Sequence, residues 1–209
     1  MGNVSHVKSK TFAANGADTT AICANQTNSG SGSMTLTDTG PAGVLVPGNL
    51  GTTVTIISTA SDSNTGITFD VTGMGVDGSE VSQTGITGPA GTSTVTTTQV
   101  FVSVTSITHS GTCTNVSCGI TATTTGTGVV FAGRTRVRGM HIKPSGTAGL
   151  IDFKNTSSSG TKLLEIGVHT DQTPVDPYIP DDGVLFDAGA FINLGSTDLA
   201  SNITVFYDG

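Results

Sequence analysis

The sequence predicts an all-β protein made of two small antiparallel domains in series, each of the β-sandwich or barrel-like type, with a flexible N-terminal segment. Its 209 residues include 38 Thr, 21 Ser and 29 Gly but no Trp. β-Branched Thr suits pleated strands, and Gly suits the turns between them. Turn signals recur about every 8–12 residues, which is typical of sandwiches and barrels. No segment keeps the 3.6-residue period of a helix over about ten residues.

Charge is unevenly distributed and indicates where the domains divide. Charged residues make up 11 % of the chain, and none of the eight Lys and Arg lies in residues 11–133, which contain six acidic residues. A compositional break of this kind usually marks a domain boundary. We therefore expect an irregular N-terminal arm over residues 1–30, a Thr/Gly-rich β domain over residues 31–128 and a second β domain over residues 129–209.

The strands expected in the first domain rest on alternation and on turn residues. Ile67, Phe69 and Val71 alternate with polar residues, the period-two pattern of a half-buried strand. Asp77-Gly78 then predicts a tight hairpin turn, from which residues 80–87 return antiparallel. The other strands are expected over residues 35–39, 54–59, 94–98, 100–107 and 120–125.

The second domain is expected to contain a series of short strands separated by polar loops. A loop at residues 155–160 separates two of the strands, and a Pro- and Asp-rich loop spans residues 173–183. The strands are expected over residues 129–131, 135–142, 150–153, 163–168, 184–186, 190–194 and 202–207. We expect them all to pair antiparallel.

Residues 73–78, Gly-Met-Gly-Val-Asp-Gly, match the glycine pattern of a dinucleotide-binding loop. That loop needs a strand before it and a helix after it, so that the helix N-terminus can face the pyrophosphate. Here a second strand is expected to follow. We interpret the glycines as parts of a hairpin and expect no cofactor.

Two cysteines stand close together in the sequence. Cys113 and Cys118 bracket four residues, a spacing that fits a tight turn with the two thiols near each other across a hairpin. In an oxidising medium this pair could form a disulfide. A structural zinc site needs four ligands, and only Cys23 and distant histidines remain to complete one. We therefore expect no metal site.

Basic residues cluster where the second domain begins. Arg134, Arg136 and Arg138 alternate with other residues, so a strand would direct all three guanidinium groups to one face. One interpretation is a solvated sheet face. The other is a contact with another subunit, because Arg is enriched at interfaces and pairs bidentately with carboxylates. Lys8 and Lys10 of the N-terminal arm are the second region for which we expect a contact with another subunit.

The acidic residues do not form a recognisable catalytic pattern. Asp176, Asp181, Asp182 and Asp187 lie close together in the sequence, but glycoside hydrolysis needs two carboxyls opposed across a sugar. Their spacing is not that of a calcium loop, and the chain has no G-x-S-x-G motif. We interpret these residues as solvated loop acids and expect neither catalytic residues nor enzymatic activity.

Three further classes of role are disfavoured. The net charge is −7, whereas affinity for nucleic-acid phosphate comes chiefly from Lys and Arg. No run approaches the roughly 18 apolar residues of a membrane span. The first ten residues are polar and lead into no apolar region of a signal peptide. We expect no nucleic-acid partner, no membrane association and no secretion signal.

Two parts of the chain carry more specific motifs. In the first, a strand ends in the turn Thr72-Gly-Met-Gly-Val-Asp-Gly78 and leads through Glu80 to Thr87-Gly-Pro89. The first part comprises residues 67–89, 93–98 and 101–107, and the second comprises residues 136–142, 146–149, 159–164, 179–186 and 203–207. Both resemble β-rich modules of virion structural proteins of tailed bacteriophages, of the capsid decoration (cement) or head-fibre type.

The resemblance implies a structural role in a virus particle. We expect a capsid decoration protein that stabilises the shell, made in the host bacterial cytoplasm and located at the surface of the virion. Its partners would be the major capsid protein or other virion subunits, and further copies of itself, with a trimer favoured. The alternative is a tail or head-fibre protein that attaches to a host receptor. An aromatic content of only 5 % counts against a sugar-binding version of that alternative.

Overall fold

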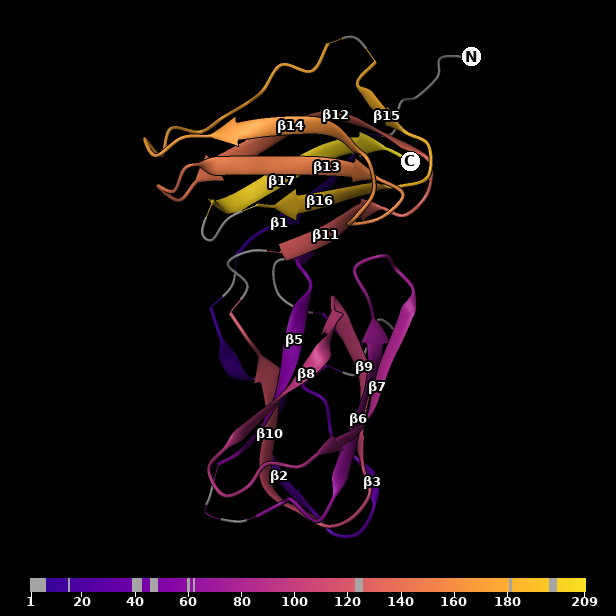
Figure 1. The fold of residues 1–209 in the computed structure, drawn as a ribbon, viewed down its shortest axis with the longest axis vertical. Coiled ribbons are helices and arrows are strands. Elements are labelled where there is room, and N and C mark those ends of the chain that lie inside the picture. Colours follow the sequence, from indigo (N-terminus) through magenta and orange to yellow (C-terminus); the bar gives the residue numbers. More distant parts are fainter. Residues whose placement is uncertain are drawn as a thin grey trace. The chain divides into compact units, whose positions relative to one another are not determined.

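The computed structural model describes residues 7–14, 16–38, 43–45, 49–59, 61, 63–122, 126–180, 182–195 and 199–209. Its contacts divide the chain into two compact units (Figure 1). Unit 1 comprises Met1–Asn15, Pro47–Leu50 and Thr124–Gly209, and unit 2 comprises Gly16–Val46 and Gly51–Thr123. Over the described residues the named elements are all strands, which form four antiparallel sheets and no closed barrel. The all-β, sandwich-like prediction is confirmed.

Unit 2 is built from two sheets. The first has the order β2–β10–β5–β8, formed by Asp18–Asn28, Cys113–Ile120, Thr52–Ser58 and Thr94–Phe101. The second has the order β3–β9–β6–β7, formed by Gly32–Ser33, Ser103–His109, Thr68–Met74 and Glu80–Thr87, and β4 (Val44–Leu45) also pairs with β9. Strands that are neighbours in a sheet are therefore often distant in the sequence.

The core of unit 2 lies between these sheets. In β6, Phe69, Val71 and Gly73 are buried while the residues between them are more exposed, as the alternation in the sequence predicts. The buried apolar residues come from both sheets: Ile22, Cys23, Met34, Val54, Ile56, Phe69, Val71, Ile86, Phe101, Val104, Ile107, Cys113, Val116, Cys118 and Ile120. Burial of this set accounts for the face-to-face packing of the two sheets.

Polar side chains inside unit 2 bond the backbone where strand pairing is irregular. The register of β5 on β8 shifts between Thr53 and Thr55, and there the buried Thr97 hydroxyl accepts a hydrogen bond from the Val54 amide at 2.9 Å. Buried Asn64 accepts from the Thr114 amide at 2.9 Å and donates to the Thr114 carbonyl oxygen at 3.1 Å. These contacts satisfy backbone groups that the ladders leave without partners.

The glycine motif at residues 73–78 forms a hairpin, as predicted. β6 pairs antiparallel with β7 on either side of it. Gly78 has a φ of +80°, a left-handed conformation that Gly adopts at little cost. A Cβ atom on Gly73 would lie 2.0 Å from the Ser103 carbonyl oxygen of β9, so a side chain there would push the two strands apart. Strand packing and turn geometry thus explain these glycines.

Unit 1 also contains two sheets. The first has the order β1–β17–β12–β15, formed by Lys8–Phe12, Ala200–Asp208, Thr135–Pro144 and Val184–Phe186. The second has the order β11–β16–β13–β14, formed by Gly126–Phe131, Ala190–Leu194, Gly149–Asn155 and Lys162–Val168. One apolar core draws residues from both, including Phe12, Met140, Phe153, Ile192 and Val205.

A β-bulge sets the register of β12. The pairing of β12 with β17 shifts between Val137 and Gly139. As a result Val137, Met140 and Ile142 are all buried, although strict alternation would place Val137 and Met140 on opposite faces. The extra residue keeps the apolar side chains in the core and Lys143 exposed on the other face.

The N-terminal region differs from the prediction. The expected irregular arm over residues 1–30 is wrong for residues 8–12 and 18–28, which form β1 and β2. β1 pairs with the last strand of the chain, with Lys8 opposite Tyr207. Local sequence cannot show this, because β1 is mostly polar and its partner follows about 190 residues later. Residues 1–6 lie outside the described residues.

Two of the expected strands in the first domain also differ. Residues 35–38 form no strand, although the Thr35 amide donates to Gln26 Oε1 at 2.9 Å. The strand expected over residues 120–125 is instead the end of β10, which stops at Ile120, and residues 123–125 lie outside the described part of the chain. Single backbone hydrogen bonds remain in both segments, from the Thr37 amide to the Ile22 carbonyl oxygen at 2.9 Å and from the Thr121 amide to the Thr53 carbonyl oxygen at 3.2 Å, but they do not extend into a ladder.

Candidate functional site

The basic residues expected to make contacts lie in or beside one sheet of unit 1. Lys8 and Lys10 are on β1, Arg136 and Arg138 are on β12, and Arg134 immediately precedes β12. β17 lies between β1 and β12 in this sheet. The fold therefore brings together two segments that are more than a hundred residues apart in the sequence.

The lysines and arginines lie on different sides of that sheet. Lys8 and Lys10 alternate in phase with buried Phe12, so they follow the core side of the edge strand β1. Lys8 Nζ lies 5.4 Å from the centroid of the Phe131 ring and donates a hydrogen bond to the Gly209 carbonyl oxygen. The two lysines cover the rim of the core, on the face of the sheet opposite to Arg136.

Lys10 provides a test of this placement. Burial lowers the pKa of the Lys10 ammonium, because the charged form loses hydration. Because the pKa is lowered, the charged Lys10 side chain destabilises the folded state at neutral pH. This destabilisation disappears as the pH rises from the folded-state pKa toward the unfolded value of 10.5. Lys10→Met should therefore raise the free energy of unfolding at pH 7 by about 0.5 kcal/mol, since contact of Nζ with the Phe12 ring offsets part of the desolvation cost.

Urea denaturation at pH 7 and pH 10 measures this effect, and the gain should shrink at the higher pH. Lys8→Met is the matched control, because it removes an ammonium that donates to Gly209. That control should not stabilise the protein. A Lys10→Met variant that is less stable than the parent at pH 7 would contradict the placement of Lys10 against the core rim.

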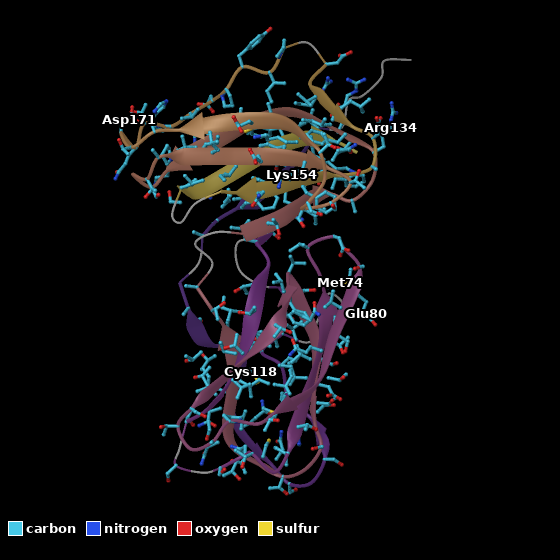
Figure 2. The ribbon with its side chains drawn as sticks, in the orientation of Figure 1. Met74, Glu80, Cys118, Arg134, Lys154 and Asp171 are labelled. Carbon is cyan, nitrogen blue, oxygen red and sulfur yellow. The ribbon has the colours of Figure 1, made fainter. Side chains whose placement is uncertain are left out.

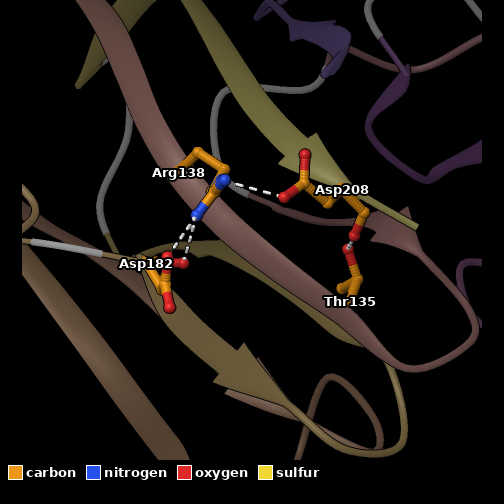
Figure 3. A network of polar contacts seen from close by, with 4 residues as sticks. All are labelled: Thr135, Arg138, Asp182 and Asp208. Carbon is orange, nitrogen blue, oxygen red and sulfur yellow. Dashed lines mark hydrogen bonds and ion pairs between the residues drawn. The ribbon is translucent and has the colours of Figure 1, made fainter. Parts of the chain in front are cut away.

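Arg134, Arg136 and Arg138, here called the arginine cluster, lie beside Asp208 and two loop carboxylates, Asp182 and Asp187. Arg138 Nε lies 2.8 Å from Asp208 Oδ2, and Arg138 Nη1 lies 2.8 Å from the Asp182 carbonyl oxygen and 3.5 Å from Asp182 Oδ1 (Figure 3). Thr135 Oγ1 donates to the backbone carbonyl oxygen of Asp208. Arg136 and Asp208 are cross-strand partners, which places their side chains on one face of the sheet.

Arg138 is the structural member of the cluster. Its side chain is 29 % exposed and bonds carboxylate and carbonyl oxygens from two different segments. Asp208 Oδ1 is buried and has no hydrogen-bond partner within the described structure, so Arg138 supplies the charge that compensates this carboxylate. Removing that guanidinium would leave a partly buried carboxylate without a counter-charge, which is destabilising.

Arg134 and Arg136 are the members free to bind something else. Arg134 Nε lies 3.7 Å from Asp187 Oδ1, and both side chains are well exposed, so this pair contributes little to stability. Arg136 makes no ion pair with any described residue. Figure 2 labels Arg134 where the chain enters β12.

A pocket opens between these two side chains. It has a volume of about 320 Å³ and is lined by Arg134, Thr135, Arg136, Leu185, Asp208 and Gly209. We call it the arginine pocket. Two guanidinium groups at the wall of a small, open pocket can bind a carboxylate through charge-assisted hydrogen bonds.

The acidic loop residues have partners that the sequence did not reveal. Asp182 and Asp187 pair with arginines of the cluster, and Asp176 Oδ1 lies 2.8 Å from His141 Nδ1 of β12. These carboxylates remain exposed, as expected of loop acids, yet they are held against one sheet. Asp181 lies outside the described residues. In the sequence, only a Pro- and Asp-rich loop that follows a basic strand pointed to these pairs. Which carboxylate meets which basic residue depends on the tertiary structure.

The cysteines are placed differently from the prediction. Cys113 and Cys118 lie on the same strand, β10, so the expected hairpin between them is wrong. All three cysteines are buried and free. The residue opposite Cys118 is Cys23 of β2. The error arose because β10 continues through a left-handed Asn115, with a φ of +51°, where the sequence suggested a turn.

Charge is divided between the two units. All eight Lys and Arg fall in unit 1 with nine of the fifteen acidic residues, so unit 2 carries six acidic residues and no Lys or Arg. The arginine cluster therefore sets three guanidinium groups against three Asp carboxylates, and Arg136 is its member without an ion-pair partner among the described residues. A guanidinium group of this kind can pair with a carboxylate of a partner.

The described part of the chain contains no group of three or more His, Cys, Asp or Glu side chains that could hold a metal ion. It also contains no helix long and apolar enough to cross a membrane. Comparison with known protein families, with curated proteins and with solved structures gives no match to this chain.

Proposed function

We propose that this chain is a structural protein of a bacteriophage virion, and that it decorates the capsid by binding shell subunits through the arginine cluster. The observation that carries the proposal is Arg136, which lines the arginine pocket without an ion-pair partner among the described residues. The resemblance of residues 67–107 and 136–207 to phage virion proteins supports the particle as its location.

The division of roles within the cluster suggests how it would bind. Asp208 and Asp182 fix Arg138, which in turn anchors the end of β17 beside β12. Arg136 then projects from a rigid strand. Arg134 would have to give up only its weak, exposed ion pair with Asp187 in order to bind a carboxylate of a partner. A carboxylate of the major capsid protein entering the pocket would accept hydrogen bonds from both guanidinium groups at little cost in side-chain ordering.

The wider proposal concerns assembly and place. We propose that the protein acts as a homo-oligomer, with a trimer favoured, because particle surfaces present partners in symmetric sets. It is made in the host bacterial cytoplasm and joins the surface of the virion. Light scattering coupled to gel filtration measures the mass of the free protein, and the mass of a single chain at all concentrations would contradict the oligomer.

Binding of the protein to shells that lack it tests the main proposal. The double variant Arg134→Ser/Arg136→Ser keeps Arg138 and its network, so it should fold normally. Loss of two charged donors should weaken binding about tenfold or more, because hydrogen bonds to charged groups contribute about 1.5–3 kcal/mol each. Occupancy as a function of added protein, measured on purified shells, gives the affinity.

Lys154→Ser is the matched control, since Lys154 is a half-buried basic residue of β13 on the other sheet of unit 1 (Figure 2). It should bind like the parent. Unchanged occupancy of the double variant, or an equal loss in the Lys154 variant, would overturn the arginine cluster as the contact. Binding of the parent should also fall as salt rises.

A second candidate function rests on one exposed aromatic residue. Tyr178, in the loop between β14 and β15, is 86 % exposed. An exposed ring can stack on a sugar, as a tail or head-fibre protein that attaches to a host receptor would require. Cryo-electron microscopy of the source particle separates the two functions. Density on the shell favours decoration, and density only at the tail or a fibre tip favours attachment.

A further inference from the structure

Two cysteines from distant parts of the sequence face each other in unit 2. Cys23 of β2 and Cys118 of β10 are directly opposite in an antiparallel pair. Residues so placed have Cα atoms about 4.5 or 5.5 Å apart, and disulfides join Cα atoms about 4.4–6.8 Å apart. Both residues are fully buried in the same core cluster. The backbone therefore already holds the spacing that a disulfide requires.

The two thiols also interact. A hydrogen bond between the Cys118 and Cys23 side chains lowers the pKa of the Cys23 thiol, and the same contact, with burial, raises the pKa of Cys118. Cys113 is different, because it lies opposite Asn28 and its sulfur is 3.9 Å from Met34 Sδ. Of the three cysteines, only Cys23 and Cys118 form a facing pair.

We propose that Cys23 and Cys118 are the site of an intrachain disulfide, which forms when the folded protein meets a low-molecular-weight disulfide such as oxidised glutathione. One cysteine thiolate attacks the oxidant, forms a mixed disulfide and releases one glutathione thiol. The thiolate of the other cysteine then attacks the protein sulfur of that mixed disulfide and releases the second glutathione. Two S–H bonds are lost, one S–S bond forms, and the two electrons reduce the oxidant to two thiols.

The position of β2 gives the oxidant a route to the buried pair. β2 is the edge strand of its sheet: it pairs with β10 on one side, whereas on the other it is contacted near Cys23 by Thr37, which belongs to no strand and bonds the Ala21 and Ile22 carbonyl oxygens. Its register on β10 shifts on both sides of the Cys118–Cys23 pair, so the ladder there is interrupted. Edge segments with irregular ladders open more readily than central strands. Opening of β2 would expose Cys23, and reclosing would bring Cys118 to the mixed disulfide.

The disulfide would connect an edge strand to the centre of unit 2 and close a long loop. Residues 23 and 118 enclose most of unit 2. Closing a loop of this length restricts the unfolded chain strongly, so the melting temperature of the oxidised protein should exceed that of the reduced protein by about 10 °C or more. This inference does not depend on the proposed function, because it concerns unit 2 alone.

In the test, the folded protein is incubated with oxidised glutathione, its free thiols are blocked, and the mass of the intact protein is measured by mass spectrometry. A disulfide lowers the mass by about 2 Da and leaves one free thiol. Trypsin has no cleavage site within residues 11–133, so pepsin is used to map the linked peptides. We expect the Cys23–Cys118 linkage, and we expect the Cys113→Ala variant to form it as the parent does.

Cys23→Ala and Cys118→Ala should each remain without an intrachain disulfide and show no rise in melting temperature on oxidation. Should either variant fail to fold, the linkage map of the Cys113→Ala protein decides by itself. The denatured parent serves as a positive control for the oxidant. A Cys113–Cys118 or Cys23–Cys113 linkage in the native protein would overturn the proposal. So would native protein that keeps three free thiols while the denatured chain oxidises.

Discussion

Insertion of one alanine between Gly139 and Met140 is expected to unfold unit 1 or to cost it about 4 kcal/mol or more of its free energy of unfolding. The bulge between Val137 and Gly139 lets Val137 and Met140 both face the core. An added residue after the bulge would reverse the faces of the strand beyond it, so that Met140 and Ile142 turn outward. His141 and Lys143 would be buried in their place. Lost apolar burial and unpaired buried polar groups both oppose folding.

Tyrosine fluorescence during urea denaturation measures this effect on unit 1 alone, because both tyrosines, Tyr178 and Tyr207, belong to unit 1. Gly139→Ala is the matched control. A Cβ atom there would meet only Phe206 Cδ2, at 3.9 Å, so this variant should be nearly as stable as the parent. An insertion variant with parental stability would show that the bulge does not set the register.

Gly73→Ala is expected to destabilise unit 2 by about 3 kcal/mol, although it adds a single methyl group. The added carbon would lie 2.0 Å from the Ser103 carbonyl oxygen and 3.0 Å from Val104 Cα. Both contacts are with backbone, which cannot rotate away, so β6 and β9 must separate. Overpacking of this kind typically costs about 1–3 kcal/mol and occasionally more. Differential scanning calorimetry measures the change.

Gly66→Ala is the control for this second prediction. Gly66 lies in the turn before β6, and a Cβ atom there would have nothing within 4 Å. It should change stability by about 0.5 kcal/mol or less. If Gly73→Ala were equally mild, the close approach of β6 to β9 would be wrong, and the glycines of residues 73–78 would need another explanation.

The arginine cluster links the fold to the proposed function. Arg138 has its partners within unit 1, whereas Arg136 lines the pocket without one among the described residues. This division allows a binding test that spares the fold, since Arg134 and Arg136 can be changed while the Arg138–Asp208 contact remains. Rigid, pre-positioned groups of this kind lower the cost of ordering side chains on binding.

The sequence alone was sufficient for the fold class and for much of the strand pattern. Thr and Gly content, together with regular turn signals, predicted an all-β chain, and the alternation around Phe69 predicted β6. The hairpin at residues 73–78 also followed from local rules, because Asp-Gly turns and period-two strands are encoded by neighbouring residues.

The tertiary structure decided every feature that depends on distant partners. β1 is a strand because it pairs with β17 at the other end of the chain, and its polar sequence gave no local sign of this. The arginines alternate in the sequence, but the sequence does not show which carboxylates they meet. The sheet and its loop bring Asp208 and Asp182 to Arg138 and leave Arg136 without an ion-pair partner among the described residues. Cys118 faces Cys23 and not Cys113, because pairing of β2 with β10 determines the neighbour of each thiol. Strand pairing joins residues across long loops at a small extra cost in entropy, so sequence proximity does not determine which side chains meet.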